Sequence, residues 1–213
     1  MTVLLSHNCG QSHKEASAAL QKLSVRPSYA MAELGALICL PAFTDEGLLN
    51  AVIETPMGAR NKFTYDEKLG LFRLKKVLPV GHVFPFHFGF IPSTWADDDG
   101  PLDVLILLEE PAFPGCLVEA RLLGAVEARQ TKNARKVRND RLIAVADKMP
   151  SLGHYRNLKD VPDSVLSQIE HFFISYNKAE GKTFTPLGRA DAKAAKELVH
   201  QGEKKFLRKL KAK

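Results

Sequence analysis

The segment Phe84-Pro-Phe-His-Phe-Gly-Phe-Ile-Pro-Ser-Thr-Trp-Ala-Asp-Asp-Asp-Gly-Pro-Leu-Asp-Val-Leu-Ile-Leu-Leu108 joins an aromatic strand to an apolar strand through an acidic turn. Asp97, Asp98 and Asp99 are consecutive, and Asp103 lies where the second strand starts. Carboxylates crowded in this way repel each other unless a cation lies among them. Oxygen ligands without Cys or His favour Mg²⁺ or Mn²⁺ over zinc. The segment predicts a metal site, with an exposed hairpin loop as the alternative.

Four further motifs surround this segment, and each alone has little specificity. They are Ala51-Val-Ile-Glu-Thr-Pro56, Asn61-Lys-Phe63, Asn139-Asp-Arg-Leu-Ile-Ala-Val145 and His171-Phe-Phe with Tyr176. Together, and in this order, the five motifs resemble the soluble family I inorganic pyrophosphatases (inorganic diphosphatases). The resemblance extends from about residue 40 to about residue 200. It implies a hydrolase that uses a metal-activated water to split inorganic pyrophosphate into two phosphates.

The resemblance also assigns roles to individual residues of this chain. The implied metal ligands are Glu54, Asp98, Asp103 and Asp140. The implied substrate-binding residues are Lys62, Lys76, Arg141 and Tyr176. The implied catalytic residues are Asp98, Asp99, Asp103 and Tyr176. Mg²⁺ is the expected cofactor, with Mn²⁺ as a substitute, because two bridged metal ions lower the pKa of bound water and clamp the reacting oxygens.

Several site positions depart from the family pattern. The family motif reads Asp-Gly-Asp-Pro-x-Asp, whereas residues 98–103 read Asp-Asp-Gly-Pro-Leu-Asp, so Gly100 replaces the aspartate that contacts the attacking water. Asp99 and Asp140 each lie one residue from a lost acid and are therefore included as substitutes. Side chains alternate between the two faces of a strand, so an acid one residue away points to the opposite face. This argues against Asp99 or Asp140 taking over the role of the lost acid. The remaining departures are Thr64, Lys76, Phe88, Gln130, Asn139 and Asn177.

Three functions stay open at this stage. The first is a divergent, metal-dependent inorganic pyrophosphatase. The second is a catalytically weakened homologue that hydrolyses or only binds another phosphoanhydride. The third is an OB-type nucleic-acid-binding protein in which the phenylalanines of residues 84–90 stack on bases. We rank them in this order, because an acidic turn beside the phenylalanines repels a phosphate backbone.

Composition favours a cytoplasmic protein with one main domain. The 213 residues are 45% hydrophobic and carry a net charge of +6. Residues 1–38 lack a sustained apolar face and have no counterpart in the resemblance, so we expect a poorly defined extension before a single domain at 39–213. Three cysteines, at positions 9, 39 and 116, indicate neither a disulfide framework nor a zinc site. We expect a homo-oligomer that contacts neither membrane nor nucleic acid.

Hydrophobic periodicity predicts many short strands followed by two helices. Strands are expected at residues 49–54, 62–66, 71–75, 83–90, 104–108, 115–121 and 142–145. Helices are expected at about residues 160–181 and 191–209. Short strands at this spacing are typical of a barrel. The fold class is therefore α+β, and the resemblance implies a small closed OB-like β-barrel flanked by two C-terminal helices.

Overall fold

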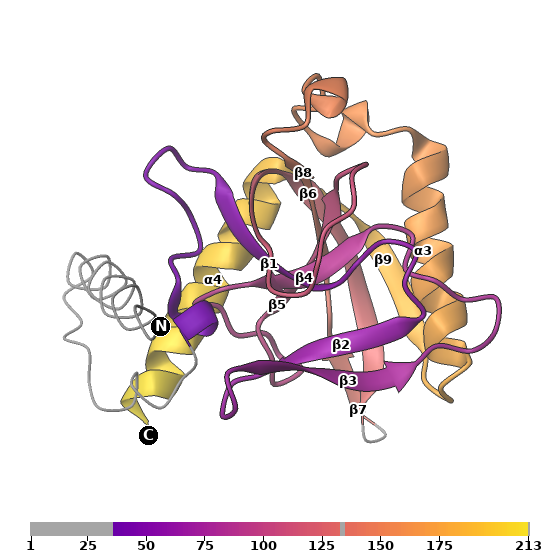
Figure 1. Ribbon diagram of the computed structural model, residues 1–213, viewed down its shortest axis with the longest axis horizontal. Helices are drawn as coiled ribbons and strands as arrows, with labels where there is room; N and C mark the ends of the chain where they lie inside the picture. The colour runs from indigo at the N-terminus through magenta and orange to yellow at the C-terminus, as the bar shows by residue number, and fades with distance from the viewer. Residues whose placement is uncertain (1–35, 133–134, 213) are drawn as a thin grey trace, which may run out of the picture.

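The computed structural model describes residues 36–132 and 135–212 (Figure 1). Nine strands, two α-helices and three 3₁₀ helices are described in these ranges. The strands are β1 (Leu49–Thr55), β2 (Asn61–Asp66), β3 (Leu71–Val77), β4 (His87–Ile91), β5 (Leu102–Leu107), β6 (Leu117–Lys132), β7 (Arg135–Arg138), β8 (Arg141–Ala146) and β9 (Phe184–Asp191). The helices are η1 (Ala36–Cys39), η2 (Pro150–Leu152), η3 (Leu158–Asp160), α3 (Asp163–Lys178) and α4 (Ala192–Lys211).

Five strands close into a barrel. Their order is β1-β4-β5-β8-β6, and β6 also pairs with β1, so the ring has no free edge. All of these pairings are antiparallel except that between β5 and β8. Strands β1, β4 and β8 are buried along their whole length, because helices cover the outside of the ring while their other face fills its interior. The expected closed barrel with two C-terminal helices is confirmed.

Strand β6 is longer than the sequence predicted. It runs over 16 residues and pairs in turn with β1, β8, β9 and β7. A register shift between Leu122 and Gly124 bends it, so that one strand serves several neighbours. Its second half, the hairpin partner β7 and the edge strand β9 were not expected. They are polar or contain Pro186 and Gly188, and therefore lack the apolar alternation that identifies a strand.

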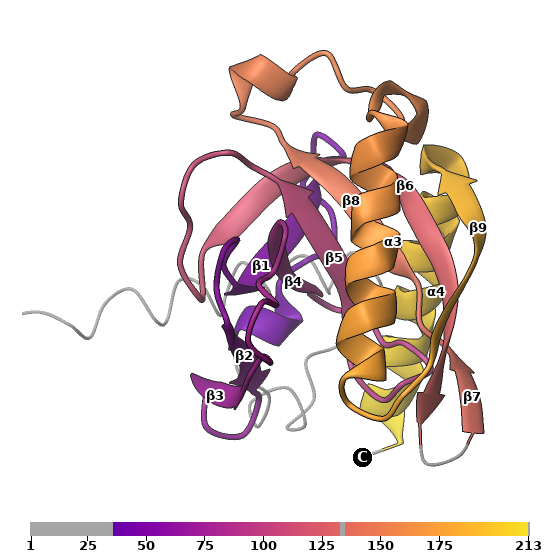
Figure 2. The same ribbon diagram turned by 90° about the vertical axis from the view of Figure 1, so that its right-hand side faces the viewer.

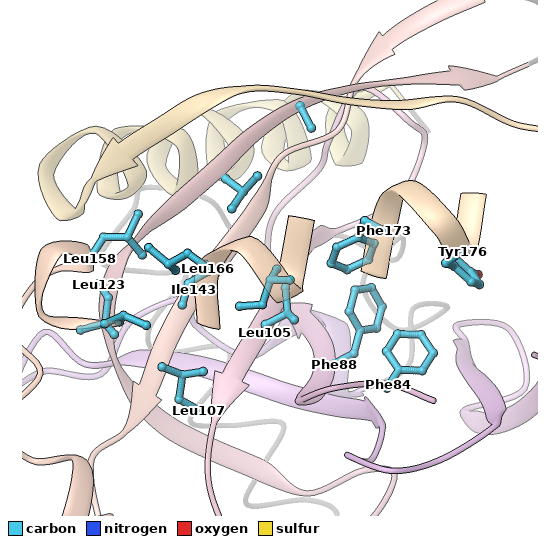
Figure 3. Packing of buried hydrophobic residues seen from close by; sticks show 14 of the residues in the cluster. Phe84, Phe88, Leu105, Leu107, Leu123, Ile143, Leu158, Leu166, Phe173 and Tyr176 are labelled. Atoms are coloured by element: carbon cyan, nitrogen blue, oxygen red, sulfur yellow. The ribbon is translucent and has the colours of Figure 1, made fainter. Parts of the chain in front are cut away.

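Helix α3 lies along one side of the barrel beside β9 (Figure 2), whereas α4 lies on another side (Figure 1). The buried α3 residues Leu166, Ile169, Phe173 and Tyr176 pack on side chains of β4, β5, β6 and β8. Figure 3 shows Phe84, Phe88, Phe173 and Tyr176 gathered at one end of this cluster. The predicted start at residue 160 falls instead in η3, and α3 begins directly after Pro162.

Helix α4 covers another side of the ring. Ala195 and Val199 join the apolar cluster around β1, β5 and β8, whereas Phe206 and Leu210 pack with residues of η1. Among the described residues, no helix combines the length and the hydropathy needed to cross a membrane.

The two-stranded sheet β2–β3 stands apart from the ring but contacts β1. Its register places Lys62 directly opposite Lys76. Side chains that face each other across antiparallel strands lie close together. The hairpin therefore brings two of the predicted substrate-binding lysines side by side.

The proposed boundary after residue 38 stays a prediction. Residues 1–35 lie outside the described residues, but Ile38 is buried and packs with Phe206 and Leu210. Its carbonyl also accepts a hydrogen bond from the backbone N–H of Ser93. The packed part of the chain thus includes residues just before position 39.

The close backbone contact between β1 and β4 can be tested by substitution of Gly89. A Cβ added at this position would lie 2.0 Å from the carbonyl oxygen of Val52, which is backbone and cannot move aside. We expect Gly89→Ala to lower the free energy of unfolding by about 3 kcal/mol or more, measured by urea denaturation. Gly100→Ala is the control, because nothing lies within 4 Å of its added Cβ. Equal stability of the two variants would contradict the described strand contact.

Candidate active site

Arg141, the first residue of β8, is the centre of the candidate site. It is 4% exposed, and its guanidinium carbon lies 4.7 Å from the ring centroid of Phe173 and 5.5 Å from that of Phe184. These rings come from α3 and β9 and hold the guanidinium by cation–π contact. A buried arginine keeps its charge, so the site contains a fixed cation.

The Arg141 guanidinium donates hydrogen bonds to three side chains. Nη1 donates to Asp103 Oδ2 at 2.5 Å and to the amide oxygen of Asn139, and Nη2 donates to Gln130 Oε1 at 3.5 Å. Nε is buried and has no hydrogen-bond partner among the described residues. The guanidinium thus neutralises one carboxylate and orients two amides.

Asn139 extends this network to the acidic turn. Its amide nitrogen donates to Asp98 Oδ2 at 3.0 Å and to Gln130 Oε1 at 2.8 Å. Asp98 and Asp103 are therefore connected through Asn139 and Arg141. We call the five residues Gln130, Asn139, Arg141, Asp98 and Asp103 the arginine–amide network.

The turn that carries Asp98 has one residue in the left-handed region. Asp99 has φ +66°, whereas Gly100, which tolerates such a conformation most easily, does not adopt it. The turn closes through a 2.7 Å hydrogen bond from Ala96 N–H to the carbonyl of Gly100. Asp97 points to Lys205 of α4 at 2.6 Å, so this acid belongs to a surface ion pair. Of the three consecutive aspartates, Asp98 joins the arginine–amide network directly.

Lys62 lies over aromatic rings. Its Nζ is 4.6 Å from the ring centroid of Phe88 and 5.7 Å from those of Phe84 and Tyr176. Burial lowers the pKa of Lys62 to about 8, although the charges of Asp103 and Glu54 raise it. This lysine therefore changes charge close to physiological pH.

Lys76 shares the ring of Tyr176 with Lys62. Its Nζ lies 4.5 Å from the ring centroid and pairs with Glu180, which also accepts a hydrogen bond from Lys182 at 3.2 Å. Burial lowers the pKa of Lys76, while Glu180 opposes this shift. Burial also raises the pKa of Tyr176, so its phenol stays protonated. The sequence did not point to Glu180, which follows the helix outside every quoted motif.

Glu54 is buried at the end of β1, close to the hairpin β2–β3. Its Oε1 accepts hydrogen bonds from Tyr65 N–H at 2.8 Å and from the Thr64 hydroxyl at 3.2 Å. Burial raises the pKa of this carboxyl group, and the hydrogen bonds oppose the shift. Thr64, one of the departures from the family pattern, is thus a neutral donor to Glu54.

Asp140 has different partners from its neighbours in sequence. Its Oδ1 accepts hydrogen bonds from Ala128 N–H at 2.9 Å and Arg138 Nε at 2.6 Å, and Arg138 also pairs with Glu127. Side chains of successive residues in an extended chain point to opposite faces. Asp140 therefore points away from the face on which Asn139 and Arg141 form the network. The hydrogen bonds of the described residues do not bring the side chain of Asp140 into the arginine–amide network, and its role as a metal ligand stays a prediction.

The donors fit a single hard cation better than a group of ions. Carboxylate oxygens of Asp98 and Asp103, with amide oxygens, are chemically suited to Mg²⁺. However, the described residues contain no group of three or more His, Cys, Asp or Glu side chains that could hold a metal. The amide oxygens of Gln130 and Asn139 already accept hydrogen bonds from Arg141. A second ion bridged by several carboxylates does not fit this donor set.

The phenylalanines of residues 84–90 bear on the nucleic-acid hypothesis. Phe84, Phe88 and Phe90 are at most 2% exposed, and Phe86 is partly buried against the same core. Base stacking requires exposed ring faces. The stacking interpretation of these residues is therefore wrong.

The structure brings most of the predicted site residues to one region. Lys62, Lys76 and Tyr176 lie together, and the charges of Asp103 and Arg141 act on the ionisation of both Lys62 and Tyr176. Glu54 acts on Lys62 as well. The individual roles assigned to these residues stay predictions.

Comparisons with known proteins agree on one family. The sequence profile described as "Inorganic pyrophosphatase" matches residues 51–207. An inorganic pyrophosphatase from a Nostoc species is 37% identical over 167 residues, which cover 78% of this chain and 96% of the relative. One from Thermus thermophilus is 39% identical over 155 residues, covering 71% of this chain and 86% of the relative.

Solved structures give the same result. The crystal structure of inorganic pyrophosphatase from Thermus thermophilus superimposes with a TM-score of 0.73 at 36% identity, covering 80% of this chain and 98% of that one. A structure from Helicobacter pylori gives a TM-score of 0.72 at 26% identity and covers 79% of this chain. The chain belongs to the inorganic pyrophosphatase family.

Proposed function

We propose that this protein hydrolyses inorganic pyrophosphate to two phosphates, at a low rate and with the help of a divalent metal ion. The observation that carries the proposal is the convergence of Lys62, Lys76 and Arg141 around Tyr176 and Asp103. Cations in a partly buried site favour a highly charged anion and stabilise the charge of the departing phosphate. Family membership identifies that anion as pyrophosphate.

Each basic side chain has a separate task in this proposal. Lys62 and Lys76 approach the substrate from the hairpin, each as a compact cation over an aromatic ring. Arg141 approaches from β8 with a guanidinium whose orientation is held by its hydrogen bonds. Tyr176 stays protonated and can donate a hydrogen bond to a phosphate oxygen.

Mg²⁺ is the metal ion that we propose, with Mn²⁺ as a substitute. Asp98 and Asp103 would hold it, and the ion when bound would lower the pKa of a coordinated water. Gly100 offers no carboxylate to that water, and Gln130 and Asn139 add no negative charge near it. The low rate follows from this loss of acids.

We further propose a homo-oligomer located in the cytoplasm. Cys39 and Cys116 are free thiols, which suits a reducing compartment, whereas Cys9 lies outside the described residues. Leu71 and Leu74 of β3 are 62% and 54% exposed, and Val80 of the following loop is 86% exposed. We propose that these exposed apolar side chains of β3 and the loop after it lie at the contact between copies of the chain.

Phosphate release from pyrophosphate is the first test. We expect slow release with Mg²⁺, no release in excess chelator, and a loss of about tenfold or more in Asp98→Asn, because that residue is a proposed ligand. Asp97→Asn is the control, since its partner is Lys205 on the surface. Release that survives chelation, or equal loss in both variants, would contradict the proposal.

The pH dependence should report the charge of Lys62. Its pKa is lowered to about 8, so the ammonium that attracts the anion is present below that pH and is lost as the pH rises through it. We expect kcat/KM to fall by about tenfold per pH unit above about pH 8. Lys62→Arg stays charged and serves as the control that subtracts substrate ionisation. A wild-type profile parallel to that of the variant would exclude this role.

The exchange Asp99→Gly with Gly100→Asp tests why the enzyme is slow. Glycine relieves the positive φ at position 99, and a Cβ at position 100 meets nothing within 4 Å. The exchange restores the family motif, so turnover should rise about 10- to 100-fold in a phosphate-release assay under saturating Mg²⁺. If turnover falls instead, and Asp99→Asn also abolishes it, Asp99 already serves as the base.

A further inference from the structure

We propose that the arginine–amide network excludes a second divalent ion from this site, so that the protein binds pyrophosphate without any metal and holds at most one divalent ion per chain. The inference rests on the proposed function for the identity of the anion but not for turnover. It assigns anion binding and metal-assisted hydrolysis to separable parts of the site.

The contacts of Asp103 provide the first argument. This carboxylate is 22% exposed and pairs with a guanidinium that is 5% exposed. A desolvated charge pair of this kind is costly to separate, because each partner would be left uncompensated. An incoming metal ion would therefore compete for Asp103 with the Arg141 guanidinium, which is part of the chain itself.

The amides provide the second argument. The Asn139 oxygen accepts a hydrogen bond from Arg141, and the Gln130 oxygen accepts from both Arg141 and Asn139. These oxygens face hydrogen-bond donors, and neither carries a charge that needs a cation. Both amide oxygens therefore have hydrogen-bond donors within the network. A set of carboxylates at these positions would instead need a cation to offset its charge.

The balance of charge provides the third argument. Lys62, Lys76 and Arg141 are cations, whereas the network contains only the two carboxylates of Asp98 and Asp103. Glu180 offsets one of the lysines. Glu54 also acts on Lys62, so the cations are balanced by carboxylates from separate elements rather than by one acidic cluster.

Arg141 is also held in place. Two aromatic rings flank its guanidinium carbon at 4.7 and 5.5 Å, and a third hydrogen bond from Nη1 reaches the backbone carbonyl of Asp140 at 3.2 Å. Its buried Nε has no partner among the described residues, so one donor of the fork is unused. A fixed cation with a spare donor needs no reorganisation to receive an anion.

Calorimetric titration of the full chain with pyrophosphate in excess chelator tests the proposal. We expect binding to persist, and Arg141→Gln to weaken it by about 10- to 100-fold because a charge-assisted hydrogen-bonding group is lost. Arg138→Gln is the matched control, since this neighbouring arginine pairs with Glu127 and Asp140. Absence of binding heat in chelator, or equal weakening in both variants, would overturn the proposal.

A second measurement does not depend on the stability of an Arg141 variant. Titration with Mn²⁺ alone, followed by electron paramagnetic resonance, should give at most one ion per chain for the wild type. Gln130→Asp with Asn139→Asp should raise that number and weaken pyrophosphate binding in chelator, because carboxylates then surround Arg141. Two or more ions in the wild type would overturn the proposal.

The two proposals fail in different ways. Binding in chelator without phosphate release under Mg²⁺ would remove the proposed hydrolysis and leave the role of Arg141 intact. Phosphate release under Mg²⁺ with no binding in chelator would do the reverse.

Discussion

Closure of the barrel by β6 is the constraint on which the remaining structure depends. Because β6 pairs with β1 at one end and β8 further along, the ring has no free edge. The same strand continues outward to pair with β7 and β9. This continuation delivers Gln130 beside Asn139 and Arg141, where β8 begins. Fold and site are therefore linked through a single strand.

The burial of Arg141 adds a second constraint. Its guanidinium contacts Phe173 of α3, Phe184 of β9 and Asp103 of β5, and a buried charge without partners would be strongly destabilising. Asp103 and Asn139 therefore serve the stability of the fold as well as the chemistry of the site. Substitution of either residue changes both properties, which is why matched surface controls are needed.

Compared with its family, the chain keeps the basic side of the site and alters the acidic side. Lys62, Lys76 and Arg141 act around Tyr176, and Lys76, which departs from the family pattern, pairs with Glu180. On the other side, the amides Gln130 and Asn139 stand at positions that depart from the family pattern. Anion binding and water activation need not decline together in such a site.

The sequence was sufficient to predict the strands and helices with strong apolar periodicity, the closed barrel through family resemblance, and the residues that gather around Tyr176. It did not predict β7, β9 or the second half of β6, since polar strands are formed by pairing with neighbours rather than by their own pattern. Nor did it place Glu180 beside Lys76, or turn Asp140 towards Arg138. Such contacts join residues through the packing of separate elements, and spacing along the chain carries no information about them.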